Sequence, residues 1–150
     1  MFWGCFHGET AGPGIFWEKD WGTIDAESFQ AHIVPIIHGY IRLNPNLQLM
    51  QDGAPGHKAE STRQELRERG VKFIFWPPYS PDLNLIKRVW HLMKNYLQEK
   101  YSEKMSYDAL RAAVKEAWEV VGSVELEDLI NSMGVRCQAV IDANGMFTPY

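Results

Sequence analysis

Positively charged side chains gather in the middle third of the chain, where they could bind a polyanion. From Lys58 to Lys104 the sequence holds ten Lys and Arg against six Asp and Glu, a local charge of +4, whereas the whole chain has a net charge of −4. Cations at this density can contact phosphate groups, but they are also typical of an ordinary solvated surface. We single out these candidate phosphate contacts: Lys58, Arg63, Arg67, Lys87, Arg88 and Lys94.

The cysteines and most histidines lack a spacing that indicates chemistry. Cys5 and Cys137 lie far apart and outside any CxxC or Cys/His pattern, which argues against a disulfide framework or a structural zinc site. The histidines without ligand spacing are His7, His32, His38 and His91.

The composition indicates one globular domain over residues 1–150. With 45% hydrophobic and 23% charged residues, the chain falls outside the disordered classes. No stretch approaches the ~20 apolar residues needed to cross a bilayer, and the N-terminal MFWGCFHGE does not resemble a signal peptide. We therefore expect no membrane association and a nuclear or cytoplasmic location.

Alternating apolar runs and helical patterns predict the elements that position these residues. The runs at 1–6 and 14–20 predict a hairpin with the loop HGETAGPG, and those at 47–51 and 71–76 predict two more strands. Asp25 can cap a helix over about 26–41, which Pro35 should kink. Further helices are predicted before Gly70, over about 83–97, over about 106–121 and over about 125–142. This order indicates an α/β fold with a mixed sheet flanked by helices.

Two strings stand out, QDGAPGHKA and FIFWPPYSPDLNLIKRVWHLMK, preceded by MFWGCF and GTIDAESF. In this order they resemble the catalytic domain of mariner-type transposases of the DDE superfamily, over about residues 1–100; residues 101–150 form a C-terminal helical extension. The resemblance implies a ribonuclease H-like fold and DNA cleavage and transfer by two Mg²⁺ or Mn²⁺ ions that three carboxylates hold. The motif residues that it gives are His57, Trp76, Pro77, Ser80, Pro81, Asp82, Asn84 and Trp90.

By this resemblance, Asp52 matches the family's second acid, but the third acid is replaced. The family pattern resembles PDLNPIENVW and this chain has PDLNLIKRVW, so Lys87 stands where a glutamate is expected. An ammonium group cannot coordinate a metal ion and repels one. The first acid and the central strand that carries it are expected upstream of Met1. Asp52 is thus the one remaining metal ligand, and we expect no tight binding of Mg²⁺ or Mn²⁺.

Two other polar residues near these acids have structural interpretations. Asp82 precedes the helix after the motif, and we interpret it as the N-cap of that helix rather than as a metal ligand. For His57 two interpretations stay open: it shapes the site or contacts DNA, or it makes a hydrogen bond that anchors its loop.

Together these observations predict a degenerate, transposase-derived domain that is catalytically inactive and binds DNA in a weak, salt-sensitive manner. One alternative is a domesticated protein-interaction module, effector-like or oligomerising, without a DNA role. A second alternative is a residual metal-dependent nuclease. Loss of the central strand would leave unpaired strand edges, so we also expect a homodimer or another strand-edge partner.

Overall fold

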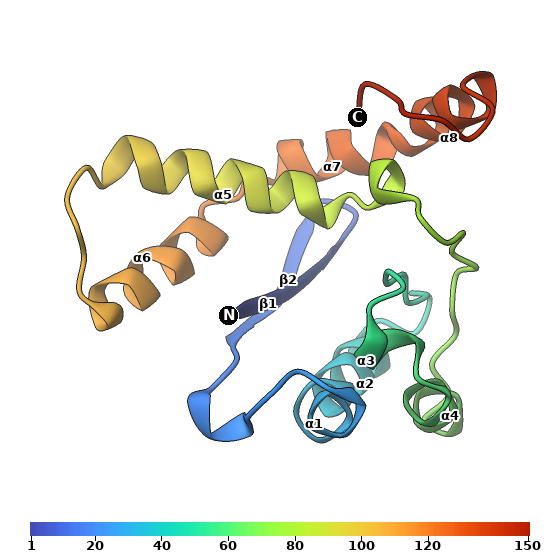
Figure 1. The fold of residues 1–150 in the computed structure, drawn as a ribbon, viewed down its shortest axis with the longest axis horizontal. Coiled ribbons are helices and arrows are strands. Elements are labelled where there is room, and N and C mark those ends of the chain that lie inside the picture. The colour runs from blue at the N-terminus through green and yellow to red at the C-terminus, as the bar shows by residue number, and fades with distance from the viewer. The chain divides into compact units, whose positions relative to one another are not determined.

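The computed structural model describes all 150 residues, and they divide into two compact units (Figure 1). The first unit consists of Met1 and Trp17–Ser80, and the second of Phe2–Phe16 and Pro81–Tyr150. Each unit has buried apolar side chains of its own. The single domain over residues 1–150 stays a prediction.

The first unit is helical, with a small core. Its elements are η1 (Lys19–Trp21), α1 (Ala26–His32), α2 (Val34–Leu43), α3 (Pro55–Lys58) and α4 (Glu60–Glu68). Its buried apolar side chains are Trp17, Phe29, Ile33, Val34, Ile37, Leu66 and Val71. Helix α4 stops before Gly70, as predicted, because this glycine adopts the left-handed φ of 76° that ends helices.

The predicted helix over about 26–41 is two helices, α1 and α2, which meet at Ile33. Asp25 caps α1 as predicted: its Oδ1 accepts a hydrogen bond from the Ser28 N–H at 2.9 Å, and this bond holds the pKa of Asp25 below its usual range. Pro35 lacks an N–H and fits only the first turn of a helix. The chain therefore begins a new helix at Val34, and the expected kink is a break.

The two predicted strands at 47–51 and 71–76 are wrong in extent, because only one residue of each pairs. Leu49 and Phe73 form an isolated parallel bridge, in which the Leu49 N–H donates to the Lys72 carbonyl at 2.7 Å and the Ile74 N–H donates to the Leu49 carbonyl at 2.9 Å. No third strand pairs with either segment, and a two-stranded pair without neighbours is marginal in water. Asp52 follows this bridge closely and is positioned by it.

The second unit packs helices on a β-hairpin. Its elements are β1 (Phe2–His7), β2 (Thr10–Phe16), η2 (Pro81–Leu83), α5 (Ile86–Lys100), α6 (Tyr107–Glu119), α7 (Ser123–Asn131) and α8 (Met133–Asp142). The hairpin is antiparallel, as predicted, but its turn is only Gly8 and Glu9, so most of the expected loop belongs to β2. Gly8 supplies the positive φ of 49° that a tight turn needs.

Trp118 of α6 joins the helices to the hairpin at a point where the strands carry no side chains. Gly4 and Gly14 are paired across the hairpin, and a Cβ on Gly14 would lie 2.8 Å from the Trp118 indole nitrogen. The same nitrogen, Nε1, donates a hydrogen bond to the Gly12 carbonyl at 3.1 Å. Trp90 of α5 packs beside it, with ring centroids 5.5 Å apart. The two glycines thus let an indole ring lie directly against the sheet.

The C-terminal helices differ from the prediction at one point. Helix α6 agrees with the expected 106–121, but the expected helix over 125–142 is divided at Ser132 into α7 and α8. The Ser132 Oγ donates to the Leu129 carbonyl at 2.6 Å, and such local side-chain bonds compete with the helical ladder. No helix of the structure combines the length and the apolar character that crossing a membrane requires.

The packing of Trp118 predicts opposite effects for two glycine substitutions. Gly14→Ala places a Cβ 2.5 Å from the Phe2 ring, so overpacking should lower the free energy of unfolding by about 1–3 kcal/mol. Gly39→Ala, in the interior of α2 with nothing within 4 Å, should instead raise it by roughly 0.5–1 kcal/mol. Urea unfolding of both variants tests this; a Gly14→Ala variant as stable as wild type contradicts the packing described.

Candidate functional site

Asp52 and His57 form a hydrogen-bonded pair in the first unit. His57 Nδ1 lies 2.8 Å from Asp52 Oδ1, and the Ala54 N–H donates to the same oxygen at 3.1 Å. Because an ionised carboxylate only accepts hydrogen bonds, Nδ1 is the ring nitrogen that carries the proton. The Asp52 side chain is 42% exposed and that of His57 is 22% exposed. The Asp52 carboxylate is thus accessible to solvent, and hydrogen bonds from its own loop hold one of its two oxygens.

The loop between the two residues is fixed by close packing against α1. Pro55 begins α3, and Gly56 behind it is buried, with its Cβ position 3.3 Å from the Asp25 carbonyl oxygen. The Phe29 ring lies 4.7 Å from the His57 ring, centroid to centroid. Of the two interpretations of His57, the structure therefore contains the hydrogen bond that anchors the loop; a contact with DNA stays a prediction.

The ligand set of this chain does not fit a two-metal centre. Such a centre needs several converging carboxylates, and the structure contains no group of three His, Cys, Asp or Glu side chains placed to hold a metal ion. Asp52 is the one carboxylate at its site, and its Oδ1 is already an acceptor for Ala54 and His57. The Mg²⁺ or Mn²⁺ that the family resemblance implies therefore has no complete binding site among these residues.

Lys87 lies in the second unit, on the exposed side of the first turn of α5. The helix is anchored on its other side, where Leu85 and Val89 are buried in the core of the unit. Lys87 takes part in no ion pair of the structure. The residue that stands at the third acid position is thus a solvent-exposed cation.

Asp82 is not the N-cap of α5, contrary to prediction. Helix α5 begins after Leu85 without a side-chain cap, and Asp82 lies inside the preceding 3₁₀ turn η2. Its Oδ2 instead accepts a hydrogen bond from the Thr148 Oγ at 2.8 Å. The carboxylate thus binds the C-terminal segment, and the first turn of α5 has no side-chain cap.

Arg136 of α8 also holds this motif turn, and the sequence analysis did not single it out. Its side chain is nearly buried; Nη1 donates to the Asp82 carbonyl and Nε to the Ser132 Oγ, both at 2.8 Å. Its guanidinium stacks over the Tyr150 ring, 4.5 Å from the centroid. The available signal was composition, since Arg136 is the one Lys or Arg after Lys115. A single arginine in a long segment without other lysines or arginines indicates that its side chain has a specific partner.

The other motif residues are mainly structural. Trp90 packs on the Phe2 ring at 5.9 Å, Asn84 is buried, and the Ser80 Oγ donates to the Pro78 carbonyl at 3.2 Å. The unit boundary divides the motif, so that Trp76, Pro77 and Ser80 belong to the first unit and Pro81, Asp82, Asn84 and Trp90 to the second. None of the motif residues in the first unit carries a carboxylate.

The six predicted phosphate contacts are all exposed. Lys58, Arg63 and Arg67 lie on α3 and α4, and Arg67 is paired with Glu60 at 2.7 Å. The remaining three lie on α5: Lys87, Arg88 and Lys94. The structure thus brings the candidates together in two groups of three, one in each unit.

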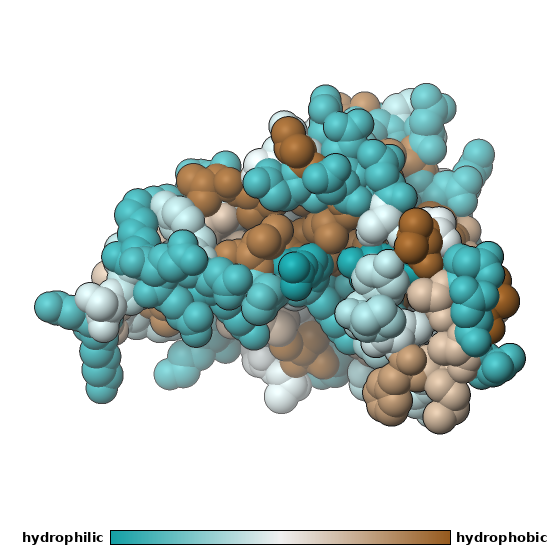
Figure 2. Space-filling view, turned by 90° about the horizontal axis from the view of Figure 1, so that it is seen from above, coloured by the Kyte–Doolittle hydropathy of each residue, from teal (hydrophilic) through white to brown (hydrophobic).

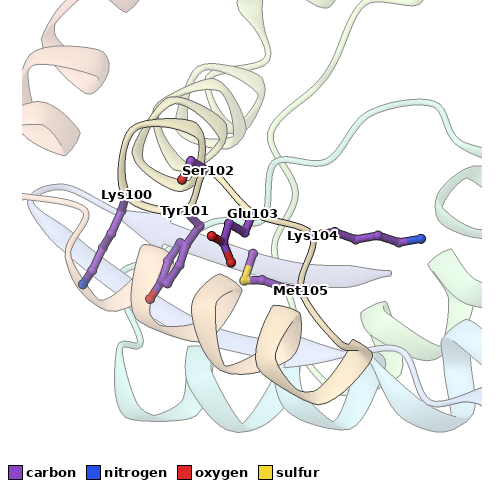
Figure 3. A pocket seen from close by; sticks show the side chains of 6 residues that line it. All are labelled: Lys100, Tyr101, Ser102, Glu103, Lys104 and Met105. Atoms are coloured by element: carbon purple, nitrogen blue, oxygen red, sulfur yellow. The ribbon is translucent and has the colours of Figure 1, made fainter.

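A shallow hollow of about 320 Å³ lies at the connection from α5 to α6, lined by Lys100, Tyr101, Ser102, Glu103, Lys104 and Met105. Figure 3 shows Lys100 and Tyr101 pointing the same way while Lys104 points away from them. The lining side chains therefore do not converge on a ligand. Lys100 and Tyr101 bind Glu116 of α6 instead, the Tyr101 hydroxyl at 2.6 Å, and Tyr96 donates to the same carboxylate. These bonds tie α5 to α6.

Comparison with known proteins gives the family. A family model described as DDE superfamily endonuclease matches residues 10–109, and the chain belongs to this family. It is 31% identical over 151 residues to the Tc1 transposase of Caenorhabditis elegans and 30% identical over 152 residues to the Tcb1 transposase of Caenorhabditis briggsae. Both matches cover all of this chain and 54% of the relative, so the chain spans about half the length of these transposases.

A solved structure confirms the fold class. The Mos1 transposase catalytic domain, solved with raltegravir and Mg, matches with a TM-score of 0.80 at 15% identity, over 98% of this chain and 76% of that chain. The predicted ribonuclease H-like α/β fold is therefore confirmed. The family model and the transposase relatives confirm the predicted mariner-type family.

The Glu116 cluster predicts a loss of stability in acid. Hydrogen bonds from Lys100, Tyr101 and Tyr96 lower the pKa of Glu116 from 4.5 to about 2. A carboxyl group whose pKa is lower in the folded state stabilises the protein above its unfolded pKa, and this stabilisation is lost as the pH falls through the folded pKa. Glu116→Gln should thus lower the melting temperature at pH 7, with the difference from wild type shrinking between pH 4.5 and about 2.

The control for this experiment is Glu119→Gln, which removes a more exposed carboxylate 4.0 Å from Lys115 on the same helix. It should change the melting temperature little at any pH. Equal effects of the two substitutions at pH 7 would show that the cluster does not stabilise the contact of α5 with α6.

Proposed function

We propose that this chain is a transposase-derived DDE domain that no longer cleaves DNA and is retained as a nucleic-acid-binding domain. The observation that carries the proposal is Lys87. It places an exposed ammonium group at the position where the family motif has a glutamate. It supports inactivity because a two-metal reaction needs negative ligands at that position, and a cation there repels the metal. A nuclear or cytoplasmic location belongs to the same proposal.

The state of Asp52 supports the same conclusion. Solved structures of the Mos1 catalytic domain are described with Mg or with Mn, so a divalent ion is the cofactor expected from the family. In this chain Asp52 offers one carboxylate, and its Oδ1 accepts hydrogen bonds from Ala54 and His57. These residues can position the Asp52 loop, but we derive no metal-dependent step from them.

The exposed Lys and Arg side chains supply the contacts for binding nucleic acid. Six Lys and Arg side chains of α3, α4 and α5 are open to solvent, and phosphate contacts of such side chains provide most of the sequence-independent affinity for DNA. The transposases among the relatives make DNA the nucleic acid of first choice. Because the contacts are electrostatic, we expect the binding to weaken as salt rises.

A second candidate function is pairing through a strand edge, as a homodimer or with another protein. The sheet of the second unit consists of β1 and β2 alone, so each strand has one neighbour. The Trp17 N–H donates to the Met1 carbonyl, and by the alternation of an antiparallel ladder Phe2 and Gly4 direct their backbone groups away from β2. On the face that Figure 2 shows, apolar side chains lie in separate groups between hydrophilic ones.

The proposed inactivity predicts the outcome of metal titrations. In calorimetry the wild type should show no saturable binding of Mg²⁺ or Mn²⁺ and should not nick plasmid DNA. Lys87→Glu should gain Mn²⁺ binding, which Asp52→Ala in the same chain should remove. The matched control is Lys94→Glu, which makes the same charge change two turns further along α5 and should gain none.

The opposite outcome is equally clear. Saturable Mn²⁺ binding and nicking by the wild type, both lost in Asp52→Ala, would establish the residual nuclease and overturn the proposal.

The strand-edge candidate predicts a change of mass and of amide protection. Light scattering should give twice the 17.3 kDa of the chain at high concentration. The amides of Phe2 and Gly4 should exchange more slowly there than after dilution, because pairing covers this edge. A monomer at all concentrations, with exchange unchanged by dilution, rejects the homodimer.

A further inference from the structure

Helix α5 presents an uninterrupted row of basic side chains to solvent. Lys87, His91 and Lys94 recur at i, i+4 and i+7 and therefore share one side of the helix. Arg88 lies next to Lys87, and all four side chains are exposed. We call these residues the basic face: Lys87, Arg88, His91 and Lys94.

No negative charge compensates the basic face within its own helix. From Ile86 to Gln98 the helix contains no Asp or Glu, and the first acid is Glu99. Lys87, Arg88 and Lys94 take part in none of the ion pairs of the structure, and His91 only approaches the Asn95 amide nitrogen at 3.4 Å. The positive charge of the face is therefore available to a ligand.

Helix α4 and the residue that follows it carry three arginines but offer no comparable surface. These arginines alternate with acids, and two of them are paired: Arg67 with Glu60 and Arg69 with Glu65, both at 2.7 Å. The segment Glu60–Arg69 holds three acids and three arginines, a net charge of zero. The two groups of predicted phosphate contacts thus differ, since Arg67 of the first group is paired with Glu60 and no member of the α5 group takes part in an ion pair.

Helix stability does not account for the cations at the start of α5. The first turn of a helix favours acids, because its free N–H groups make that end partially positive. Lys87 and Arg88 lie in this turn, which contains no acid, and no side chain caps it. Their presence costs helix stability, which a bound anion would restore.

We infer that the basic face of α5 is the surface through which this chain binds the phosphate backbone of duplex DNA, and that Lys87 itself contacts a phosphate. The inference rests on the proposed function and specifies its site. From Lys87 to Lys94 the helix advances ~10 Å at about 1.5 Å per residue. Phosphates of one strand advance ~3.4 Å per nucleotide along the axis, so the Lys87 and Arg88 end of the face and its Lys94 end can contact different phosphates.

The salt dependence of DNA binding tests this site. The probe is a mixed-sequence duplex, and its affinity is measured by fluorescence anisotropy over a range of NaCl concentrations. Each phosphate contact contributes about −0.9 to the slope of log affinity against log salt. Lys87→Ala, Arg88→Ala and Lys94→Ala should each make the slope less steep by about 0.9, and the triple variant by about 2.7. All three side chains are exposed, so the variants should fold, as circular dichroism can verify.

The matched controls are Lys19→Ala, Arg42→Ala and Lys72→Ala in the first unit, which remove three exposed cations that are not among the predicted phosphate contacts. They should leave the slope unchanged. Alanine variants of Lys58, Arg63 and Arg67 are compared in the same assay, because these residues form the other predicted group. If instead these variants flatten the slope and the α5 variants do not, the proposed function survives and the α5 site is wrong. If the wild type fails to bind duplex DNA even at low salt, the proposed function fails as well. Loss of single-stranded binding alone in the α5 triple variant would overturn the assignment to duplex DNA.

Discussion

The side chain at position 87 is a primary ammonium group, which has three N–H donors and no lone pair to offer a metal ion. This constraint excludes Lys87 as a metal ligand. Asp52 retains a carboxylate in a well-anchored loop, but a two-metal reaction needs several such ligands acting together. An inherited loop can persist without its original chemistry, because the bonds from His57 and Ala54 to Asp52 hold it without any metal. The positive charge of Lys87 instead favours the binding of an anion.

The unit that carries Lys87 is held together by contacts that involve no metal ligand. Trp118 lies on the side-chain-free pair Gly4 and Gly14, and Val89 faces the core on the opposite side of α5. Burial on that side is what directs Lys87 and Lys94 to solvent. The turn before α5 is fixed separately, by Arg136 and Thr148 on Asp82. A family fold can therefore be retained while the residues at the family's catalytic positions change their charge.

The sequence predicted the local features of this molecule better than its long-range ones. The Asp25 cap, the stop at Gly70 and the helix over about 83–97 each depend on residues a few positions apart, and all three were predicted. The bonds from Arg136 and Thr148 to Asp82 join residues more than fifty positions apart, and no local sequence pattern predicts them. The strand predicted at 71–76 was misjudged because apolar composition alone does not supply a pairing neighbour; Phe75, for example, is 86% exposed. At the candidate site, Asp52 and His57 were singled out by the resemblance, and the hydrogen bond between them, which spans only five positions, was not predicted.

We propose that this DDE domain binds DNA without a metal ion. The most direct measurement compares the affinity of the wild-type chain for one duplex DNA in EDTA and in Mg²⁺, at matched ionic strength. We predict equal affinities, because Lys and Arg contacts with phosphate need no bridging cation. Binding that requires Mg²⁺ would contradict the account, since it would mean that Asp52 still belongs to a working metal centre.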